Sequence, residues 1–253
     1  MKIGIVTSFN KRLYEYYAHR FLKSYNWPFD LFIYHEGWIP EDFAIRDNIY
    51  YRNIHNGKVG EKLEKFHAKA SEFNVDSVEK GRPDKIIHGT NYKKDAVRFS
   101  YKVFAKCDAM MAPRHSYDYM FWIDADVIFK KNITEKEVIE KFLPRKYAIS
   151  FIHRPTYYSE CGFVGYNLKN PDTRIFVKKL EEYYTSLNLL KEKEWHDSYI
   201  FDVVRKKILY NTPQFNLSPK IRKVGNPWPD TPMAEYMDHL KGKARKDAGE
   251  MLK

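Results

Sequence analysis

Cysteine is scarce in this chain of 253 residues. Cys107 and Cys161 are its only thiols, too few for a framework of disulfides or for a zinc site built from cysteines. Chains without such frameworks usually work in a reducing compartment. We therefore expect a cytoplasmic protein held together by its hydrophobic core.

Long hydrophobic runs are also missing. The first one, residues 3–6, turns polar at Thr7, which is too short for the apolar core of a signal peptide. No later run reaches the roughly 20 apolar residues that a membrane-spanning helix needs. We expect a soluble protein that contacts a membrane only at its surface, if at all.

Several familiar signatures are absent as well. The sequence has no glycine-rich phosphate loop of the Walker or dinucleotide type and no internal repeat. It also lacks zinc-finger spacing, a recognition-helix pattern and an aromatic RNA-binding signature. The commonest sequence evidence for nucleic-acid binding is therefore missing.

Acidic residues are outnumbered by basic ones. The chain has 44 Lys and Arg against 33 Asp and Glu, a formal net charge of +11. This surplus favours an anionic partner, which can be nucleic acid, a membrane surface or a phosphorylated substrate. Aromatic residues are abundant, with 20 Tyr, 17 Phe and 5 Trp. They suit stacking on nucleobases and sugars, and equally an ordinary aromatic core.

Apolar runs alternate with helical patterns along the chain. The patterns predict strands at residues 3–7, 30–34, 148–152 and 162–166, and helices at 13–25, 93–111, 174–187 and 198–207. This alternation indicates one α/β domain over residues 1–253, with a mainly parallel sheet flanked by helices.

Two segments differ from this pattern, and one strand end suggests a pocket. We expect a charged excursion near residues 57–91, made of an amphipathic helix and then a polar loop, and a basic tail near 213–253. Ligands of such sheets bind beyond the carboxyl ends of the strands. Thr7, Ser8 and Phe9 follow the first strand and are therefore candidates for a nucleotide pocket.

Two acids stand inside an almost wholly apolar run, residues 119–129. Asp124 and Asp126 are two positions apart, so their side chains point the same way in an extended segment. Ionised carboxylates are costly to bury unless a cation or hydrogen bonds compensate. Paired oxygen ligands favour Mg²⁺ or Mn²⁺, which can bridge a diphosphate and neutralise its charge as it departs. The alternative is a pair of Asp residues that cap a turn.

This run resembles the Asp-x-Asp signature of GT-A fold glycosyltransferases, whose nucleotide-binding half is a Rossmann-like α/β sheet. Two later blocks are similar to segments of the retaining blood-group A/B and α1,3-galactosyltransferase family. They are residues 157–165, YYSECGFVG, and residues 195–198, WHDS, against Trp-His-Asp-Glu in the family. The three blocks keep the family's order and rough spacing. The resemblance covers about residues 119–204 and implies a single GT-A domain.

The resemblance implies roles for single residues. Asp124 and Asp126 would hold the metal and the diphosphate, and Asp197 would contact the donor sugar. Ser198 departs from the family, which has a catalytic glutamate there. A serine hydroxyl cannot stabilise positive charge as a carboxylate does. We therefore expect that the anomeric configuration is retained by front-face attack, or that Glu160 supplies the missing negative charge. The alternatives are that Asp197 caps the following helix and that Glu160 is a surface acid.

Basic side chains on a predicted helix are candidates for donor binding. Arg98 and Lys102 lie one helical turn apart, and similar helices in these enzymes send a basic side chain to the donor. The alternative is an ordinary solvated helix face.

The tail contains a further motif. Residues 239–245, HLKGKAR, are similar to the His-x-x-Gly-x-x-Lys element of glycogenin-like transferases. The likeness implies that His239 completes the metal site, while Gly242 and Arg245 lie at the donor phosphates. The alternative is a basic amphipathic helix over residues 233–239 that continues into the tail.

Together these patterns predict a retaining, metal-dependent glycosyltransferase. It would use Mn²⁺ or Mg²⁺ to transfer a hexose from a UDP-sugar to a glycan or glycolipid acceptor. One rival is a nucleotidyltransferase, which also uses paired aspartates. The other is a basic nucleic-acid-binding protein, and the missing signatures argue against a nucleic-acid partner. The basic surplus is better explained by an anionic donor or by peripheral contact with an anionic membrane.

Overall fold

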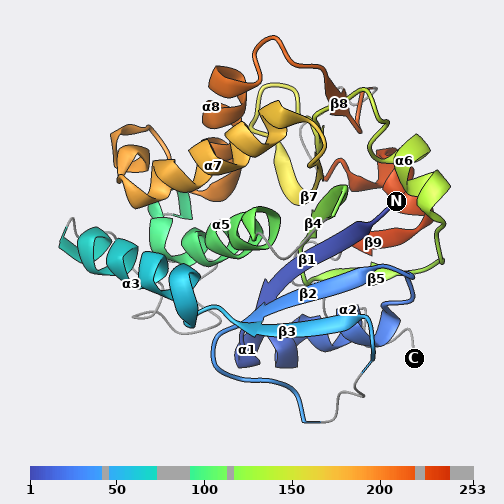
Figure 1. Cartoon of the computed structure of the whole chain (residues 1–253), viewed down its shortest axis with the longest axis horizontal. Helices are drawn as coiled ribbons and strands as arrows, with labels where there is room; N and C mark the ends of the chain where they lie inside the picture. Colours follow the sequence, from blue (N-terminus) through green and yellow to red (C-terminus); the bar gives the residue numbers. More distant parts are fainter. Residues whose placement is uncertain (42–45, 73–91, 113–116, 220–225, 240–253) are drawn as a thin grey trace.

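A seven-stranded sheet forms the centre of the protein. The computed structural model describes residues 1–41, 46–72, 92–112, 117–219 and 226–239. Within them the strand order is β3-β2-β1-β4-β7-β6-β8 (Figure 1). The strands are β1 (Ile3–Phe9), β2 (Asp30–His35), β3 (Ile49–Asn53), β4 (Tyr119–Ile123), β6 (Ile149–Ile152), β7 (Glu160–Asn167) and β8 (Gln214–Asn216). In this sheet β7 runs antiparallel to both of its neighbours, and the other pairs are parallel.

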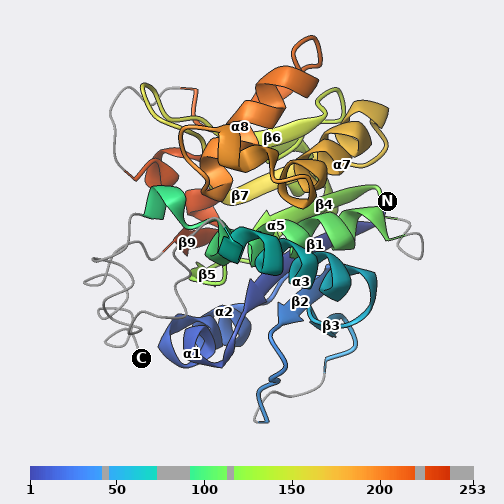
Figure 2. The ribbon, with the colours of Figure 1, turned by 90° about the vertical axis from the view of Figure 1, so that its left-hand side faces the viewer.

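Side chains alternate along the strands between two cores. On β1, Val6 belongs to one core and Ile5 to the other, as the two-residue period of a strand requires. The core with Val6 is covered by four helices (Figure 2). They are α3 (Gly57–Glu72), α5 (Ala96–Met111), α7 (Pro171–Thr185) and α8 (Asp197–Ile208).

Short helical pieces cover the opposite core. They are α1 (Lys11–Leu13), the π-helical turn η1 (Tyr14–Ala18), α2 (His19–Ser24), α6 (Glu135–Lys141) and the 3₁₀ turns η5 (Trp228–Asp230) and η6 (Pro232–Glu235). Two more 3₁₀ turns, η3 (Tyr92–Lys94) and η4 (Asn188–Lys191), flank the layer of long helices. Both faces of the sheet are thus buried, which explains the nearly continuous apolar runs of its strands.

Caps in the sequence set where several helices begin. The Asp95 side chain accepts the Arg98 N–H and starts α5. Thr134 and Glu137 form a reciprocal capping box at α6. These side chains satisfy backbone donors that a helix leaves unpaired at its start.

A two-stranded ribbon lies beside the sheet. In it β5 (Val127–Phe129) pairs antiparallel with β9 (Met237–His239), and Val127 stands opposite His239. Trp228 is buried against the ribbon and donates its indole N–H to the Met237 carbonyl oxygen at 3.3 Å. The Phe129 N–H donates to Ser24 Oγ at 3.0 Å, which joins the ribbon to α2. The ribbon therefore brings together segments about a hundred positions apart.

The α/β class and the mainly parallel sheet flanked by helices are confirmed. The expected excursion is part of the helical layer as far as α3 extends, because Leu63 and Phe66 are buried in the same core as α5. Residues 73–91 lie outside the described residues. No helix in the described part of the chain is long and apolar enough to cross a membrane.

Candidate active site

The acid pair follows the central strand β4. This strand is buried throughout and ends at Ile123, and Asp124 and Asp126 stand in the turn to β5. The Val127 N–H donates to the Asp124 carbonyl oxygen across this turn at 3.2 Å. The expectation that both acids lie in an extended segment is therefore wrong, because the chain turns directly after β4. The turn occupies the carboxyl edge of the parallel strands, where ligands of such sheets bind.

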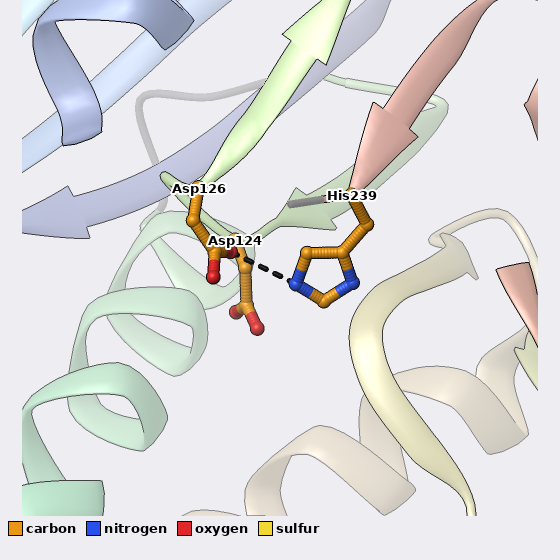
Figure 3. Close-up of side chains that lie close together, drawn as sticks. All are labelled: Asp124, Asp126 and His239. Atoms are coloured by element: carbon orange, nitrogen blue, oxygen red, sulfur yellow. Dashed lines mark ion pairs between the residues drawn. The ribbon is translucent and has the colours of Figure 1, made fainter. Parts of the chain in front are cut away.

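His239 completes a cluster with the two acids. Its Nε2 lies 2.9 Å from Asp126 Oδ1. One ligand atom each from Asp124, Asp126 and His239 lie within 4.8 Å of one another (Figure 3). The alternative of a helix through residues 233–239 is wrong, because the chain forms the short turn η6 and then the strand β9.

Close packing holds the His239 imidazole. Its ring centroid lies 4.9 Å from that of Trp228. A Cβ atom added at Gly162 would come within 2.7 Å of His239 Cε1. Any larger residue at position 162 would therefore clash with the imidazole ring of His239. The Gly162 carbonyl oxygen accepts the Asp124 N–H at 2.9 Å. Gly162 of β7 therefore lies next to both Asp124 and His239.

The cluster fits a divalent cation. Two carboxylates and one imidazole are the ligand types that Mn²⁺ accepts, and Mg²⁺ uses the carboxylates. The three side chains converge from two elements, and Gly162 provides the space that their approach needs. Asp124, Asp126 and His239 are thus the residues that would hold the ion.

Lys102 of α5 lies between two acids. Its Nζ is 2.7 Å from Asp124 Oδ1 and 2.9 Å from Asp197 Oδ2, and it donates to the Cys161 carbonyl oxygen at 2.8 Å. Burial lowers the pKa of Lys102, but the charges of Asp124 and Asp197 outweigh burial and raise it far above its usual value. Lys102 is therefore a permanent cation that bridges the cluster and Asp197.

Asp124 is oriented by two donors. Both Lys102 Nζ and the indole N–H of Trp122 donate to its Oδ1, each at 2.7 Å. Because Trp122 is buried in the sheet, this carboxylate is tied to the rigid centre of the fold. Its Oδ2 receives neither of these hydrogen bonds.

Asp197 is the first residue of α8, and it is buried. Burial raises the pKa of Asp197, but Lys102, followed by Lys106, outweighs burial and lowers the pKa to about 2. The carboxylate is therefore ionised at neutral pH. The helix cap is His196, whose Nδ1 accepts the Tyr199 N–H at 3.3 Å, so the alternative that Asp197 caps the helix is wrong.

The cap also defines the state of His196. Burial lowers the pKa of His196, and its Nδ1 already accepts a hydrogen bond. Its Nε2 lies 2.9 Å from Glu194 Oε2 and carries the proton in the neutral tautomer. Lys93 holds Glu194 in turn at 3.0 Å. The segment that presents Asp197 is thus fixed by hydrogen bonds on both sides.

Glu160 lies at the same edge of the sheet. It begins β7 and is buried, and its Oε1 accepts the Gly162 N–H at 3.2 Å. Its Oε2 lies 3.5 Å from a guanidinium nitrogen of Arg154. The alternative of an exposed surface acid is therefore wrong. Glu160 and His239 both contact the space above Gly162.

The structure does not bring the predicted strand-end residues into an open site. The Thr7 side chain is fully buried, and Phe9 packs in the core with its ring centroid 5.9 Å from that of Tyr14. Ser8 is half-buried.

Three predicted residues remain, and the charge of the first, Arg98, acts on Tyr17 together with the charges of Asp126 and Asp124. Arg98 is exposed on α5, with its guanidinium carbon 5.5 Å from the centroid of the Phe99 ring. Gly242 and Arg245 lie outside the described residues.

Tyr17 was not anticipated from the sequence. It lies in the π-helical turn η1 after β1, a type of distortion that often occurs at functional sites. Burial raises the pKa of Tyr17, and the charges of Asp126 and Asp124 raise it further, so the phenol lies within the electrostatic reach of the acid pair. Nothing in the local sequence distinguishes this tyrosine from the others around it. Only the distortion, visible in the structure, indicates its position.

Comparisons with known proteins agree with this architecture. Mouse xyloside xylosyltransferase 1 in its apo form superposes with a TM-score of 0.53, at 13% identity over 93% of this chain and 92% of that chain. An active-site mutant of LgtC gives 0.53, at 14% identity over 95% of this chain and 88% of that one. Galactosyltransferase LgtC in complex with donor and acceptor sugar analogs gives 0.52 at 13% identity, with the same coverage of 95% and 88%.

The fold is that of GT-A glycosyltransferases. No family model matches the sequence, and no curated protein does. The likeness at these identities concerns the fold. In this GT-A chain the cluster of Asp124, Asp126 and His239 lies at the carboxyl edge of the central sheet.

Proposed function

We propose that this chain is a metal-dependent glycosyltransferase that transfers a hexose from a UDP-sugar to a hydroxyl group of a glycan or glycolipid. The observation that carries the proposal is the convergence of Asp124, Asp126 and His239 at the carboxyl edge of a GT-A sheet. Two proteins of similar fold are named as a xylosyltransferase and a galactosyltransferase, which supports sugar transfer. The galactosyltransferase supports a hexose.

Nucleotidyl transfer is less well supported. That reaction commonly uses a pair of cations held by shared carboxylates. Within the described residues we find one cluster of at least three potential ligands, and it contains His239. A basic nucleic-acid-binding role has only the net charge and the aromatic content in its favour.

The residues of the chain divide the chemistry between them. Asp124, Asp126 and His239 would hold a divalent cation, which would neutralise charge on the departing diphosphate. Lys102 orients the Asp124 carboxylate by its contact of 2.7 Å. It also adds a second positive charge close to the place where the diphosphate would lie.

Asp197 is our candidate for the side chain that faces the donor sugar. It is a buried, ionised carboxylate, held 2.9 Å from Lys102. A fixed negative charge of this kind stabilises the positive charge that develops at the anomeric carbon. Glu160 supplies a second carboxylate at the same edge, while Ser198 adds no charge. Retention of configuration is part of the proposal, because residues 157–165 and 195–198 resemble retaining enzymes.

An aromatic surface next to Glu160 supports a sugar acceptor. The rings of Tyr157 and Tyr158 lie 3.9 Å apart, and Tyr157 is exposed. The guanidinium of Arg154, which also pairs with Glu160, lies 4.6 Å from the Tyr157 ring. Exposed aromatic rings are suited to stacking against the apolar face of a pyranose. Contact with an anionic membrane that carries a glycolipid rests on the net charge of +11 alone.

A donor screen tests the proposal. The protein is incubated with a panel of UDP-hexoses and Mn²⁺, and release of UDP is followed with and without excess chelator. We expect release from at least one donor, abolished by the chelator. NMR of the first product should show the anomeric configuration of the donor. Failure to turn over any nucleotide-sugar would contradict the function, whereas an inverted product would contradict retention alone.

A further inference from the structure

Asp202 is a buried acid that the proposed chemistry leaves unused. It lies on α8 five positions after Asp197, about 7.5 Å further along the helix axis, and it is 8% exposed. Its Oδ2 accepts the Ser159 N–H and its Oδ1 accepts the Ser159 hydroxyl, each at 2.7 Å. Ser159 is fully buried, so water does not compete for these hydrogen bonds. Two hydrogen bonds to one carboxylate fix the orientation of the donor residue as well as its distance.

The Asp202 carboxylate is itself held by the sheet. Arg205, three positions later on α8, donates from Nε and Nη2 to Asp202 Oδ1 at 3.0 and 2.8 Å. Nη1 of the same guanidinium donates to Gln214 Oε1 on β8 at 2.9 Å. The guanidinium carbon lies 4.2 Å from the centroid of the Phe151 ring on β6. Asp202 is thus tied through Arg205 to two strands, and Ser159 is tied to Asp202.

The segment that ends at Ser159 carries the aromatic surface proposed for the acceptor. Tyr158 directly precedes Ser159, and its ring centroid lies 4.3 Å from that of His196, which caps α8. The segment therefore contacts α8 at two points, the cap and Asp202. Asp197 lies between these points in the sequence. The two contacts hold the aromatic surface and the Asp197 carboxylate in one relative position.

We propose that Asp202 is a positioning residue that aligns the aromatic acceptor surface with Asp197 through its two hydrogen bonds to Ser159. The inference rests on the proposed function, in which Asp197 faces the donor sugar and Tyr157 contacts the acceptor. Transfer needs the acceptor hydroxyl close to the anomeric carbon, and a displacement of about 1 Å can cost about a hundredfold in rate. Hydrolysis of the donor needs only a water molecule there. Weakening the contact between Asp202 and Ser159 therefore slows transfer more than hydrolysis.

Asp202→Asn and Ser159→Ala test the inference by separating transfer from hydrolysis. UDP release from the best donor is measured alone and with a panel of methyl hexosides as acceptors. In Asp202→Asn, transfer to the best methyl hexoside should fall about tenfold more than hydrolysis does. Ser159→Ala keeps the backbone hydrogen bond, so the same shift should be smaller. The double variant should lose little beyond Asp202→Asn, because Ser159 acts through Asp202.

Thr173→Val is the matched control. The Thr173 hydroxyl is also fully buried, and it donates to the Ala148 carbonyl oxygen at 2.9 Å. Ala148 directly precedes β6, at the end of this strand remote from the acid pair. The loss of this hydroxyl should lower the melting temperature without changing the ratio of transfer to hydrolysis.

Thermal unfolding of the same proteins gives a readout that needs no activity. The losses in melting temperature from Ser159→Ala and Asp202→Asn should not add, because both variants remove the same contact. If Asp202→Asn fails to fold, Ser159→Ala decides through the ratio of transfer to hydrolysis. An unchanged ratio in the folded variants, or additive losses in melting temperature, would overturn the inference.

The wild-type protein separates this inference from the proposed function. If it releases UDP from a donor but no methyl hexoside accelerates the release, the inference about the acceptor surface is overturned and sugar-donor chemistry stands. If it turns over no nucleotide-sugar at all, the proposed function itself is refuted.

Discussion

Gly162→Ala should damage the metal site directly, because this glycine makes room for a cluster residue. The added Cβ would lie 2.7 Å from His239 Cε1 and 3.1 Å from Nδ1. The imidazole has little freedom to retreat, since it is buried against Trp228 and held by Asp126. Overpacking of this kind typically costs about 1–3 kcal/mol of stability. Displacement of a ligand side chain should lower Mn²⁺ affinity by roughly 10–100-fold.

Gly165→Ala is the matched control on the same strand. Its Cβ would meet Ser150 Oγ at 2.5 Å and the Phe121 ring at 2.7 Å, so it should also destabilise the fold. It lies away from His239 and should leave Mn²⁺ affinity close to that of the wild type. Electron paramagnetic resonance of free Mn²⁺, below the melting temperature of each variant, measures the affinities. Equal Mn²⁺ binding by Gly162→Ala and wild type, or an equal loss in both variants, would refute the reasoning.

Two further predictions concern Asp197 and the pH dependence of stability. Asp197→Asn should lower kcat about a hundredfold with a smaller change in donor affinity, whereas Ser198→Ala should change kcat little. Steady-state kinetics measure both variants, and equal losses of kcat would point to a serine-centred mechanism. Burial, followed by the charge of His55, lowers the pKa of His67 to about 4. Between pH 6.5 and 4 the unfolded chain therefore binds a proton at this residue that the folded chain does not bind. The free energy of unfolding should fall as the pH falls through this range. In urea unfolding, His67 should make the protein up to about 2 kcal/mol less stable at pH 5 than at pH 7.5. If a His67→Gln variant loses as much stability between these pH values as the wild type does, this prediction is contradicted.

The regular elements were predictable because their residues follow simple periods. The long helix α5 and the strands β1, β2, β6 and β7 lie close to their expected positions. Each buries one stripe or one face, and this leaves a repeat in the sequence. Short elements such as β5 and β9 have too few residues to show a period. Their pairing depends on contacts between distant segments.

The candidate site was predictable in its residue types and less so in its geometry. Asp124, Asp126 and His239 do converge, but the acids lie in a turn, which local apolar patterning cannot distinguish from a strand. Phe9 was expected to follow the first strand but is the last residue of β1, and the direction of its side chain depends on how Tyr14 packs back onto it. Long-range packing of this kind has no local signal.

Asp126→Asn and Asp118→Asn separate a cation-dependent reaction from a general loss of charge. Asp118 directly precedes β4, at the opposite end from the acid pair, and pairs with Lys169 at 3.2 Å. Mn²⁺ is titrated against UDP release from the best donor for both variants and the wild type. We expect saturable Mn²⁺ activation in the wild type and in Asp118→Asn, and loss of most activity in folded Asp126→Asn. Full turnover by Asp126→Asn, or by the wild type in excess chelator, would contradict a metal-dependent glycosyltransferase built on this cluster.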